Sequence, residues 1–184
     1  AFIQYPNSIG EVENYEQFVS NLKAQSIYVV VAADLLSLTL LKPPGEWGAD
    51  IVVGNTQRFG ILLGFGGPHA AYFACKEEFK RQIPGRVIGV SKDRNGNRAL
   101  RMALQTREQH IKSDRATFNS CTARALLAIM SGMYAVYHGP DGLTQIASTI
   151  YRRANMLRKV FLQKNIEVVN TSTFDTITIA VNKD

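Results

Sequence analysis

The sequence is poor in cysteine and has no long hydrophobic run. Its 184 residues include two cysteines, Cys75 and Cys121, which lie far apart in mostly apolar surroundings. Such a pair is more often two buried thiols than a disulfide, so we expect free cysteines and a reducing compartment. The apolar runs at 27–33 and 35–41 fall well short of the roughly 20 residues that a membrane-spanning helix needs, and we expect no membrane-embedded segment.

The first residues lack the features of a targeting segment. Ala1 stands where an initiator methionine would, and neither a basic stretch nor a secretory cleavage site follows it. We therefore expect no signal peptide, and we expect that the sequence begins inside a longer chain.

Acidic residues are in the minority. The chain has 21 basic and 15 acidic residues, which gives a formal net charge of +6. The densest basic stretch, 92–115, has almost no aromatic side chains that could stack on bases, so nucleic-acid binding is not expected. Attraction to an acidic protein or to a phosphate fits this charge better. A non-catalytic module that docks an acidic protein partner is therefore one interpretation of the chain.

Several catalytic motifs are missing. No Gly-x-Ser-x-Gly sequence occurs, which argues against a hydrolase with a nucleophile elbow. His69, His110 and His138 are not spaced as metal ligands, so no metal site is expected. Residues 55–59, after a predicted buried strand, read Asn-Thr-Gln-Arg-Phe without the lysine that pyridoxal chemistry needs to form an imine. Arg58 cannot substitute because its guanidinium stays protonated. We expect neither a catalytic nor a cofactor-binding residue in this chain.

The pattern that is present alternates strands and helices. Residues 13–25 carry apolar side chains at helical spacing, whereas 27–32 and 49–54 are apolar runs of the kind that is buried on both faces of a sheet. Short strands are also predicted at 1–5 and 69–74. Strand, helix and strand in this order are typical of a parallel α/β sheet.

The second half of the sequence predicts a hairpin and long helices. Asn95-Gly96 is a strong hairpin signal between strands at 86–90 and 98–103. A helix over 122–138 has too many apolar residues for a single stripe, so we expect it to be buried between elements or at an oligomer interface. The other predicted elements are a helix at 76–82, a helix at 141–164, and strands at 166–170 and 176–181. We expect a partial α/β large domain over 1–140. Residues 141–184 would form a connecting helix and the start of a small α+β domain.

A glycine-rich loop is the first candidate site. Its residues Gly66, Gly67, Pro68 and His69 could form a tight turn, or their backbone amides could wrap an anion. Neither the Walker pattern nor the dinucleotide fingerprint is met, so both alternatives stay open.

A dense polar run at 105–112 is the second candidate. Arg107, Glu108 and His110 lie between a predicted strand and a predicted helix. They form either a solvated connector or a rigid, buried hydrogen-bonded network at a subunit contact. In a buried network every donor and acceptor must be satisfied, and the planar guanidinium of Arg107 can hold several acceptors at once.

A family resemblance runs along the whole chain. The segments that carry it are 33–36 (Ala-Asp-Leu-Leu), 41–50 (Leu-Lys-Pro-Pro-Gly-Glu-Trp-Gly-Ala-Asp), 57–60, 66–71, 84–86, 103–111 (Ala-Leu-Gln-Thr-Arg-Glu-Gln-His-Ile) and 133–139. They are similar to the N-terminal half of the P-protein of the glycine cleavage system, or to the separate subunit that matches this half. The resemblance implies the large domain of the type I pyridoxal-phosphate-dependent transferase fold, with the start of the small C-terminal domain.

The resemblance also implies which residues are absent. In that family only the other half or subunit supplies the Schiff-base lysine, in the motif Asn-Leu-His-Lys-Thr-Phe, and Arg58 stands near the place of that lysine here. The aspartate that pairs with the pyridine nitrogen falls near Val31, three residues from Asp34, so its role is not carried over to Asp34. The missing lysine argues against a separate, active enzyme of this fold.

The family implies a reaction and partners for the parent enzyme. It decarboxylates glycine on pyridoxal phosphate, which the other half mainly binds, and it passes the aminomethyl group to the lipoyl arm of the H-protein. We expect this segment to be structural, inactive alone and without its own cofactor. Its expected partners are the lysine-bearing half and the lipoylated H-protein, in a homo- or hetero-oligomer. The expected compartment is the bacterial cytoplasm, or the mitochondrion for a eukaryotic source.

Overall fold

The computed structural model describes residues 1–83, 86–105 and 122–181 in two compact units. The first unit comprises Ala1–Ala74 and Arg124–Asp184, and the second comprises Cys75–Ala123. This division follows spatial contacts within the chain. The expected boundary near residue 140, between a large and a small domain, stays a prediction.

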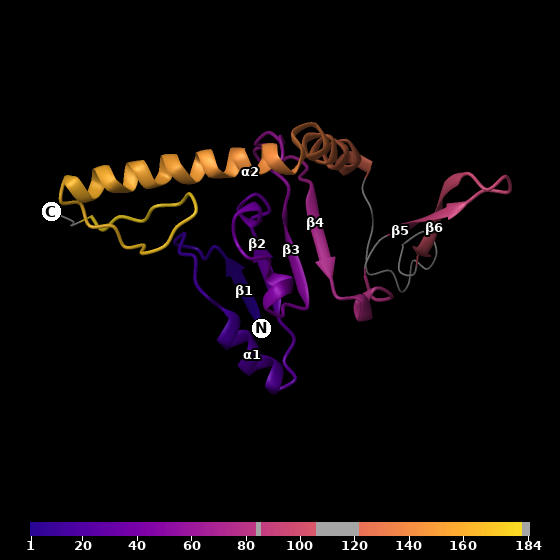
Figure 1. Ribbon diagram of the computed structural model, residues 1–184, viewed down its shortest axis with the longest axis horizontal. Helices are drawn as coiled ribbons and strands as arrows, with labels where there is room; N and C mark the ends of the chain where they lie inside the picture. The colour runs from indigo at the N-terminus through magenta and orange to yellow at the C-terminus, as the bar shows by residue number, and fades with distance from the viewer. Residues whose placement is uncertain (84–85, 106–121, 182–184) are drawn as a thin grey trace. The chain divides into compact units, whose positions relative to one another are not determined.

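A four-stranded sheet forms the centre of the first unit (Figure 1). Strands β1 (Phe2–Tyr5), β2 (Val30–Ala33) and β3 (Ile51–Asn55) are parallel neighbours in that order. Strand β4 (Ala71–Cys75) lies beside β3 at the edge. It runs in the opposite direction to β3. The evidence is that the Thr56 amide, just after the end of β3, donates a hydrogen bond to the Ala70 carbonyl, just before the start of β4, at 3.0 Å. The predicted parallel α/β sheet is confirmed for β1, β2 and β3, whereas the strand predicted at 69–74 is an antiparallel edge strand. The strands begin one to three residues later than expected.

Helix α1 (Glu16–Ala24) connects β1 to β2 and closes the first hydrophobic core. Glu16 in its first turn and Lys23 in its last turn both interact favourably with the helix dipole. The indole of Trp47, from the short 3-10 helix η2 (Pro44–Trp47), meets the ring of Tyr5 edge to face, with 5.9 Å between the centroids. This core comprises Tyr5, Val19, Val29, Val31, Ala33, Trp47 and Ala49.

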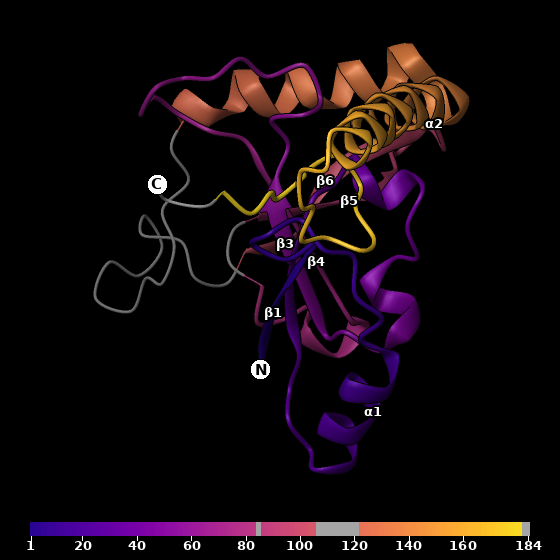
Figure 2. The ribbon, with the colours of Figure 1, turned by 90° about the vertical axis from the view of Figure 1, so that its left-hand side faces the viewer.

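Helix α2 (Ala125–Gln163) joins the two predicted helices 122–138 and 141–164 across a bend. It follows the 3-10 helix η5 (Thr122–Arg124). At Gly139 the backbone leaves the helical region, with φ 63° and ψ 179°, and Pro140 follows. The proline has no amide hydrogen to donate to the preceding turn, so the helix changes direction at this point, as Figure 2 shows. The second core lies beneath this helix and comprises Leu36, Phe59, Ala147 and Phe174.

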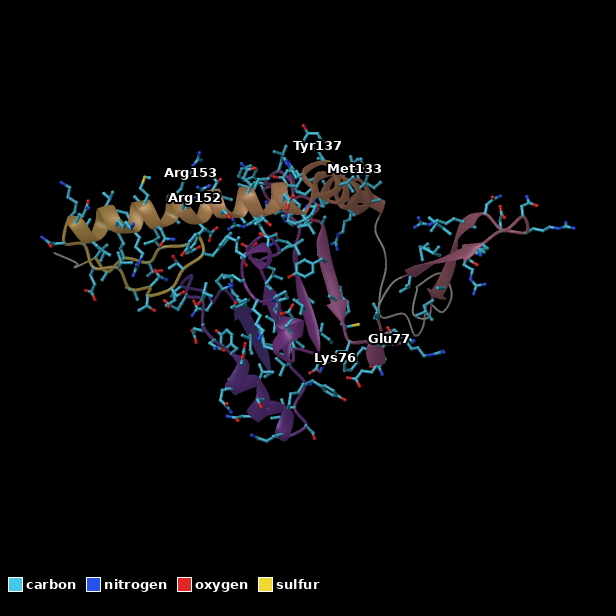
Figure 3. The ribbon with its side chains drawn as sticks, in the orientation of Figure 1. Lys76, Glu77, Met133, Tyr137, Arg152 and Arg153 are labelled. Carbon is cyan, nitrogen blue, oxygen red and sulfur yellow. The ribbon has the colours of Figure 1, made fainter. Side chains whose placement is uncertain are left out.

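The first part of α2 is apolar on two sides. Its inner side packs on the rest of the first unit, where the Tyr134 ring lies 5.9 Å from that of Phe59. On the other side Met133 and Tyr137 point away from the sheet and are largely exposed (Figure 3). The expected burial of this helix is therefore found on one side, while its outer side is an exposed apolar surface.

The segment after α2 folds back onto an early loop. The two strands expected at 166–170 and 176–181 are reduced to an isolated antiparallel bridge between Val168 and Ile179. A second bridge joins Glu11 to Thr173. The carboxylate of Glu11 accepts hydrogen bonds from the amides of Thr171 and Ser172, at 2.9 and 2.8 Å. These bonds dock the C-terminal segment on the loop that follows β1.

The second unit contains a two-stranded antiparallel hairpin. Strand β5 (Arg86–Lys92) pairs with β6 (Arg98–Gln105), with a bulge between Val87 and Ile88. The predicted Asn-Gly turn is present, and Gly96 has a φ of +85°. The helix expected at 76–82 is a single 3-10 turn, η3 (Glu77–Phe79). Cys75 is a free, half-buried thiol, and Cys121 lies outside the described residues.

The described part of the chain offers neither a candidate membrane span nor a metal cluster. None of its helices combines the length and apolarity that crossing a bilayer requires. It also contains no group of three or more His, Cys, Asp or Glu side chains able to hold a metal ion.

Candidate functional site

A cavity of about 520 Å³ opens at the C-terminal ends of β1, β2 and β3. In open α/β sheets, ligands bind in the crevice outside these strand ends. The loops that follow the strands bring charged and polar side chains to its wall. The lining residues are Gln4, Tyr5, Pro6, Ala32, Ala33, Asp34, Gly54, Asn55, Gln57 and Arg58.

Arg58 is held between two carboxylates at this cavity. Its Nε lies 2.8 Å from Oδ2 of Asp34, which follows β2 directly. Its Nη2 forms an ion pair with Oδ2 of Asp175, in the C-terminal segment. The guanidinium carbon also lies 5.8 Å from the centre of the Phe174 ring, within cation–π range. Arg58 therefore ties the ends of two strands to a segment that is 117 residues away in the sequence.

Asp34 is positioned by the backbone as well as by Arg58. Its Oδ1 accepts a hydrogen bond from the Leu36 amide at 2.9 Å, at the start of the 3-10 helix η1 (Ser37–Thr39). Burial raises the pKa of the Asp34 carboxyl above its usual value, and the Arg58 charge opposes this effect without cancelling it. The charged carboxylate is thus accommodated largely through its arginine partner.

Tyr72, from the edge strand β4, covers the end of β2. Its hydroxyl donates to the Ala33 carbonyl at 2.8 Å. Burial, with a further contribution from the Asp34 charge, raises the pKa of Tyr72 to about 12, so the phenol keeps its proton at neutral pH. Gly54 allows this approach. A Cβ at this position would lie 2.3 Å from the Ala33 oxygen and 2.5 Å from the tyrosine ring.

Two further polar side chains near the end of β3 were not singled out in the sequence. The hydroxyls of Thr56 and Ser131 lie 2.7 Å apart and join the loop after β3 to α2. The amide nitrogen Nε2 of Gln57 is buried and has no hydrogen-bond partner among the described residues. No sequence motif could have identified the contact between Thr56 and Ser131, because these residues are 75 positions apart.

The residues at this cavity do not fit covalently bound pyridoxal phosphate. The described lining contains no lysine, and the guanidinium of Arg58 is already engaged by two carboxylates. The family resemblance places the aspartate that pairs with the pyridine nitrogen near Val31. This valine is fully buried inside β2. The carboxylate at the cavity is that of Asp34, and it is paired with Arg58.

The glycine-rich loop forms a tight turn ahead of β4. The amide of Gly67 donates to the Gly64 carbonyl at 2.8 Å, and the residues between them, Phe65 and Gly66, have φ values of +46° and +95°. The backbone also approaches closely at Gly67, because a Cβ there would lie 3.0 Å from the Gly64 oxygen. The strand begins at Ala71, two residues after the predicted His69. Anion binding by this loop stays a prediction.

Gly66→Ala should lower the free energy of unfolding by about 1–2 kcal/mol, because an L side chain is strained at this positive φ. A denaturant titration measures the difference. Gly45→Ala is the matched control, since that glycine has an ordinary φ and open space around it, and it should change stability by less than about 0.5 kcal/mol. Equal effects of the two changes would show that backbone conformation is not the cause.

Among the remaining candidates, Arg107, Glu108 and His110 lie outside the described residues, so the supporting network stays a prediction. His69 is exposed. The His138 ring packs against Tyr134 and Tyr137, with centroids 4.3 and 5.0 Å away, which is a packing role.

Known proteins match the chain over its whole length. The family model described as "Glycine cleavage system P-protein" matches residues 1–184. A glycine dehydrogenase (decarboxylating) from Christiangramia forsetii is 57% identical over 99% of the chain, and one from a Nostoc species is 59% identical over 100%. A Schizosaccharomyces pombe relative, described as mitochondrial, is 55% identical over 98%. The chain spans only about a fifth of these relatives, since it covers 19%, 19% and 18% of their lengths.

Solved structures agree with this match. A crystal structure of glycine decarboxylase (P-protein) in inhibitor-bound form aligns with a TM-score of 0.91 and 37% identity, over 100% of this chain and 42% of that one. An aspartate aminotransferase from Thermus thermophilus aligns over 99% of this chain and 48% of that one, with a TM-score of 0.61 and 10% identity, which is a likeness of fold alone. The expected fold class, that of the pyridoxal-phosphate-dependent transferases, is confirmed. Because this family model matches every residue of the chain, the chain belongs to the glycine cleavage system P-protein family.

Proposed function

We propose that the chain is a structural segment of a glycine dehydrogenase (decarboxylating), from the half that lacks the Schiff-base lysine. The observation that carries this proposal is the ion-paired Arg58, at the cavity where the fold would otherwise present a reactive lysine. A guanidinium that is paired with two carboxylates is neither a nucleophile nor a proton acceptor at neutral pH. The segment supports the enzyme by its shape and its contacts.

The parent reaction then runs in the other half. The parent enzyme decarboxylates glycine with the electron-withdrawing chemistry that pyridoxal phosphate supplies, and the aminomethyl group passes to the lipoyl arm of the H-protein. In this segment Asp34, Arg58 and Asp175 hold the ends of β2 and β3 against the C-terminal segment. Taken alone, the segment is inactive and holds no cofactor.

The lysine-bearing half or subunit is the permanent partner in this proposal. The exposed apolar side of α2, with Leu126, Ile129, Met133 and Tyr137, supports an assembly, because permanent interfaces resemble hydrophobic cores. No charged residue occurs between positions 125 and 138, so a largely uncharged partner surface would fit it. The parent is thus a homo- or hetero-oligomer, in the bacterial cytoplasm or in the mitochondrion of a eukaryote.

Borohydride reduction of the intact enzyme with bound pyridoxal phosphate tests this proposal. Peptide mass spectrometry should find the reduced adduct only on a lysine outside residues 1–184. The Arg58→Lys variant should remain unlabelled at position 58, because Asp34 and Asp175 would hold the new amine in its charged form. A reduced adduct on any lysine of this segment, or at position 58 of the variant, would contradict the proposal.

A further inference from the structure

The basic charge of the chain is concentrated on the hairpin of β5 and β6. Residues 86–105 contain five basic residues and one acidic residue, a net charge of +4 in a chain whose total is +6. The acidic residue is Asp93 in the turn. Its Oδ1 accepts hydrogen bonds from the amides of Asn95 and Asn97, both at 2.8 Å, so this carboxylate is already used by the turn itself.

One face of the hairpin is apolar and exposed. Ile88 lies opposite Met102, and Val90 lies opposite Leu100. Because side chains alternate between the two faces along a strand, these four lie on the same face. Their exposed fractions lie between 46% and 70%, and both hydrophobic cores of the described residues belong to the other unit. A two-stranded hairpin is marginally stable in water by itself, so covering this face would stabilise it.

The next pair on this face places two positive charges opposite each other. Lys92 is the direct cross-strand partner of Arg98. Like charges in this position are destabilising. No acidic side chain of the described residues is paired with either of them. An occupant that brings carboxylates to this end of the face would remove the repulsion and cover the four apolar side chains beside it.

The occupant must match both halves of this surface. A nucleic acid would satisfy the basic end, but it would leave the apolar side chains uncovered, and the hairpin has no aromatic side chain for base stacking. A permanent partner suits the uncharged side of α2 better. A charged surface mainly accelerates association and sets specificity, which is what a transient partner needs.

We infer that the face formed by Ile88, Val90, Leu100, Met102, Lys92 and Arg98 is the docking surface for a transient protein partner that presents an apolar patch edged by carboxylates. This inference rests on the proposed function, under which the transient partner is the lipoylated H-protein. The hairpin contributes binding and no chemistry.

The test uses the intact enzyme and lipoylated H-protein at low salt. Lys92→Glu with Arg98→Glu should raise the KM for H-protein by about tenfold or more and leave kcat unchanged, because the rim charges steer association. The matched control is Arg152→Glu with Arg153→Glu, the same change of charge on α2, where both side chains are exposed (Figure 3). The control should change the KM by less than about twofold.

A second variant separates docking from folding. Lys92→Gln with Arg98→Gln removes the cross-strand repulsion, so it should keep or raise the melting temperature while the KM for H-protein rises about threefold. An unchanged KM in both hairpin variants, an equal change in the control, or dissociation of the halves would overturn the inference. So would binding of a single-stranded oligonucleotide that the hairpin variants lose. Borohydride labelling does not depend on docking. A failure of the KM test would therefore contradict the docking surface and leave the proposed function standing, whereas a reduced adduct on a lysine of this segment would contradict the proposed function itself.

Discussion

Asp50→Ala is expected to lower the free energy of unfolding by about 2–4 kcal/mol. The Asp50 carboxylate is buried and forms an ion pair with Lys23 of α1. It also accepts a hydrogen bond from the Val29 amide at 2.8 Å. Alanine would break this ion pair and leave a buried amide without that acceptor at the entrance to β2. A denaturant titration followed by circular dichroism measures the change.

The control for Asp50 is an ion pair at the surface. Lys42 pairs with Glu16, and both side chains are about half exposed. Exposed pairs contribute little, so Glu16→Ala should cost less than about 0.5 kcal/mol. Asp50→Asn should fall between these values, because the amide oxygen still accepts from Val29 while the charge is lost. A cost for Asp50→Ala as small as that for Glu16→Ala would mean that the buried pair does not hold α1 to the sheet.

Phe174→Ala is expected to cost about 3–5 kcal/mol, the usual range for a buried phenylalanine. Phe174 is 1% exposed and packs with Leu36, Phe59 and Ala147. Its neighbour Asp175 is one of the two partners of Arg58, so the cavity left by the ring would also loosen that ion pair. The Thr171 amide donates a hydrogen bond to the Glu11 carboxylate, and its hydrogen exchange should become faster as the stability falls.

Phe2→Ala is the matched control for Phe174. The Phe2 ring is 89% exposed at the start of β1, so its removal should change stability by less than about 0.5 kcal/mol. If both changes cost the same, the second core does not depend on Phe174. If Phe174→Ala destabilises the chain without faster exchange at Thr171, the C-terminal segment is docked by its hydrogen bonds alone.

The sequence predicts the central sheet because its signals are local. The apolar runs at 27–32 and 49–54 have the composition of strands that a parallel sheet buries on both faces, and both contain strands here. The turn at Asn95-Gly96 depends on these two residues only. The missing lysine is also a local observation, since it needs only the strand before Arg58. Propensity and periodicity are sufficient for such features.

The pairings at the cavity could not be predicted because they are not local. Asp34 and Arg58 meet because the ends of neighbouring parallel strands lie at one edge of the sheet, and Asp175 joins them from the C-terminal segment. The short segments were predicted less well. Residues 76–82 carry a helical pattern but form one 3-10 turn. The strands predicted after α2 meet only at the bridge between Val168 and Ile179, and the residues between them dock on the loop after β1 through Thr173 and Glu11.

The contact between Glu11 and the segment 171–173 also sets an order of events during folding. The partners are 160 residues apart, and closing a loop of that length costs about 4–5 kcal/mol of chain entropy. At the usual speed of translation, the loop after β1 waits about 10–30 s on the ribosome before its partner is synthesised. The first core can form from residues 3–52 during this time. Asp175 follows Arg58 by 117 residues, so Arg58 acquires its second partner only after this later stretch has been synthesised.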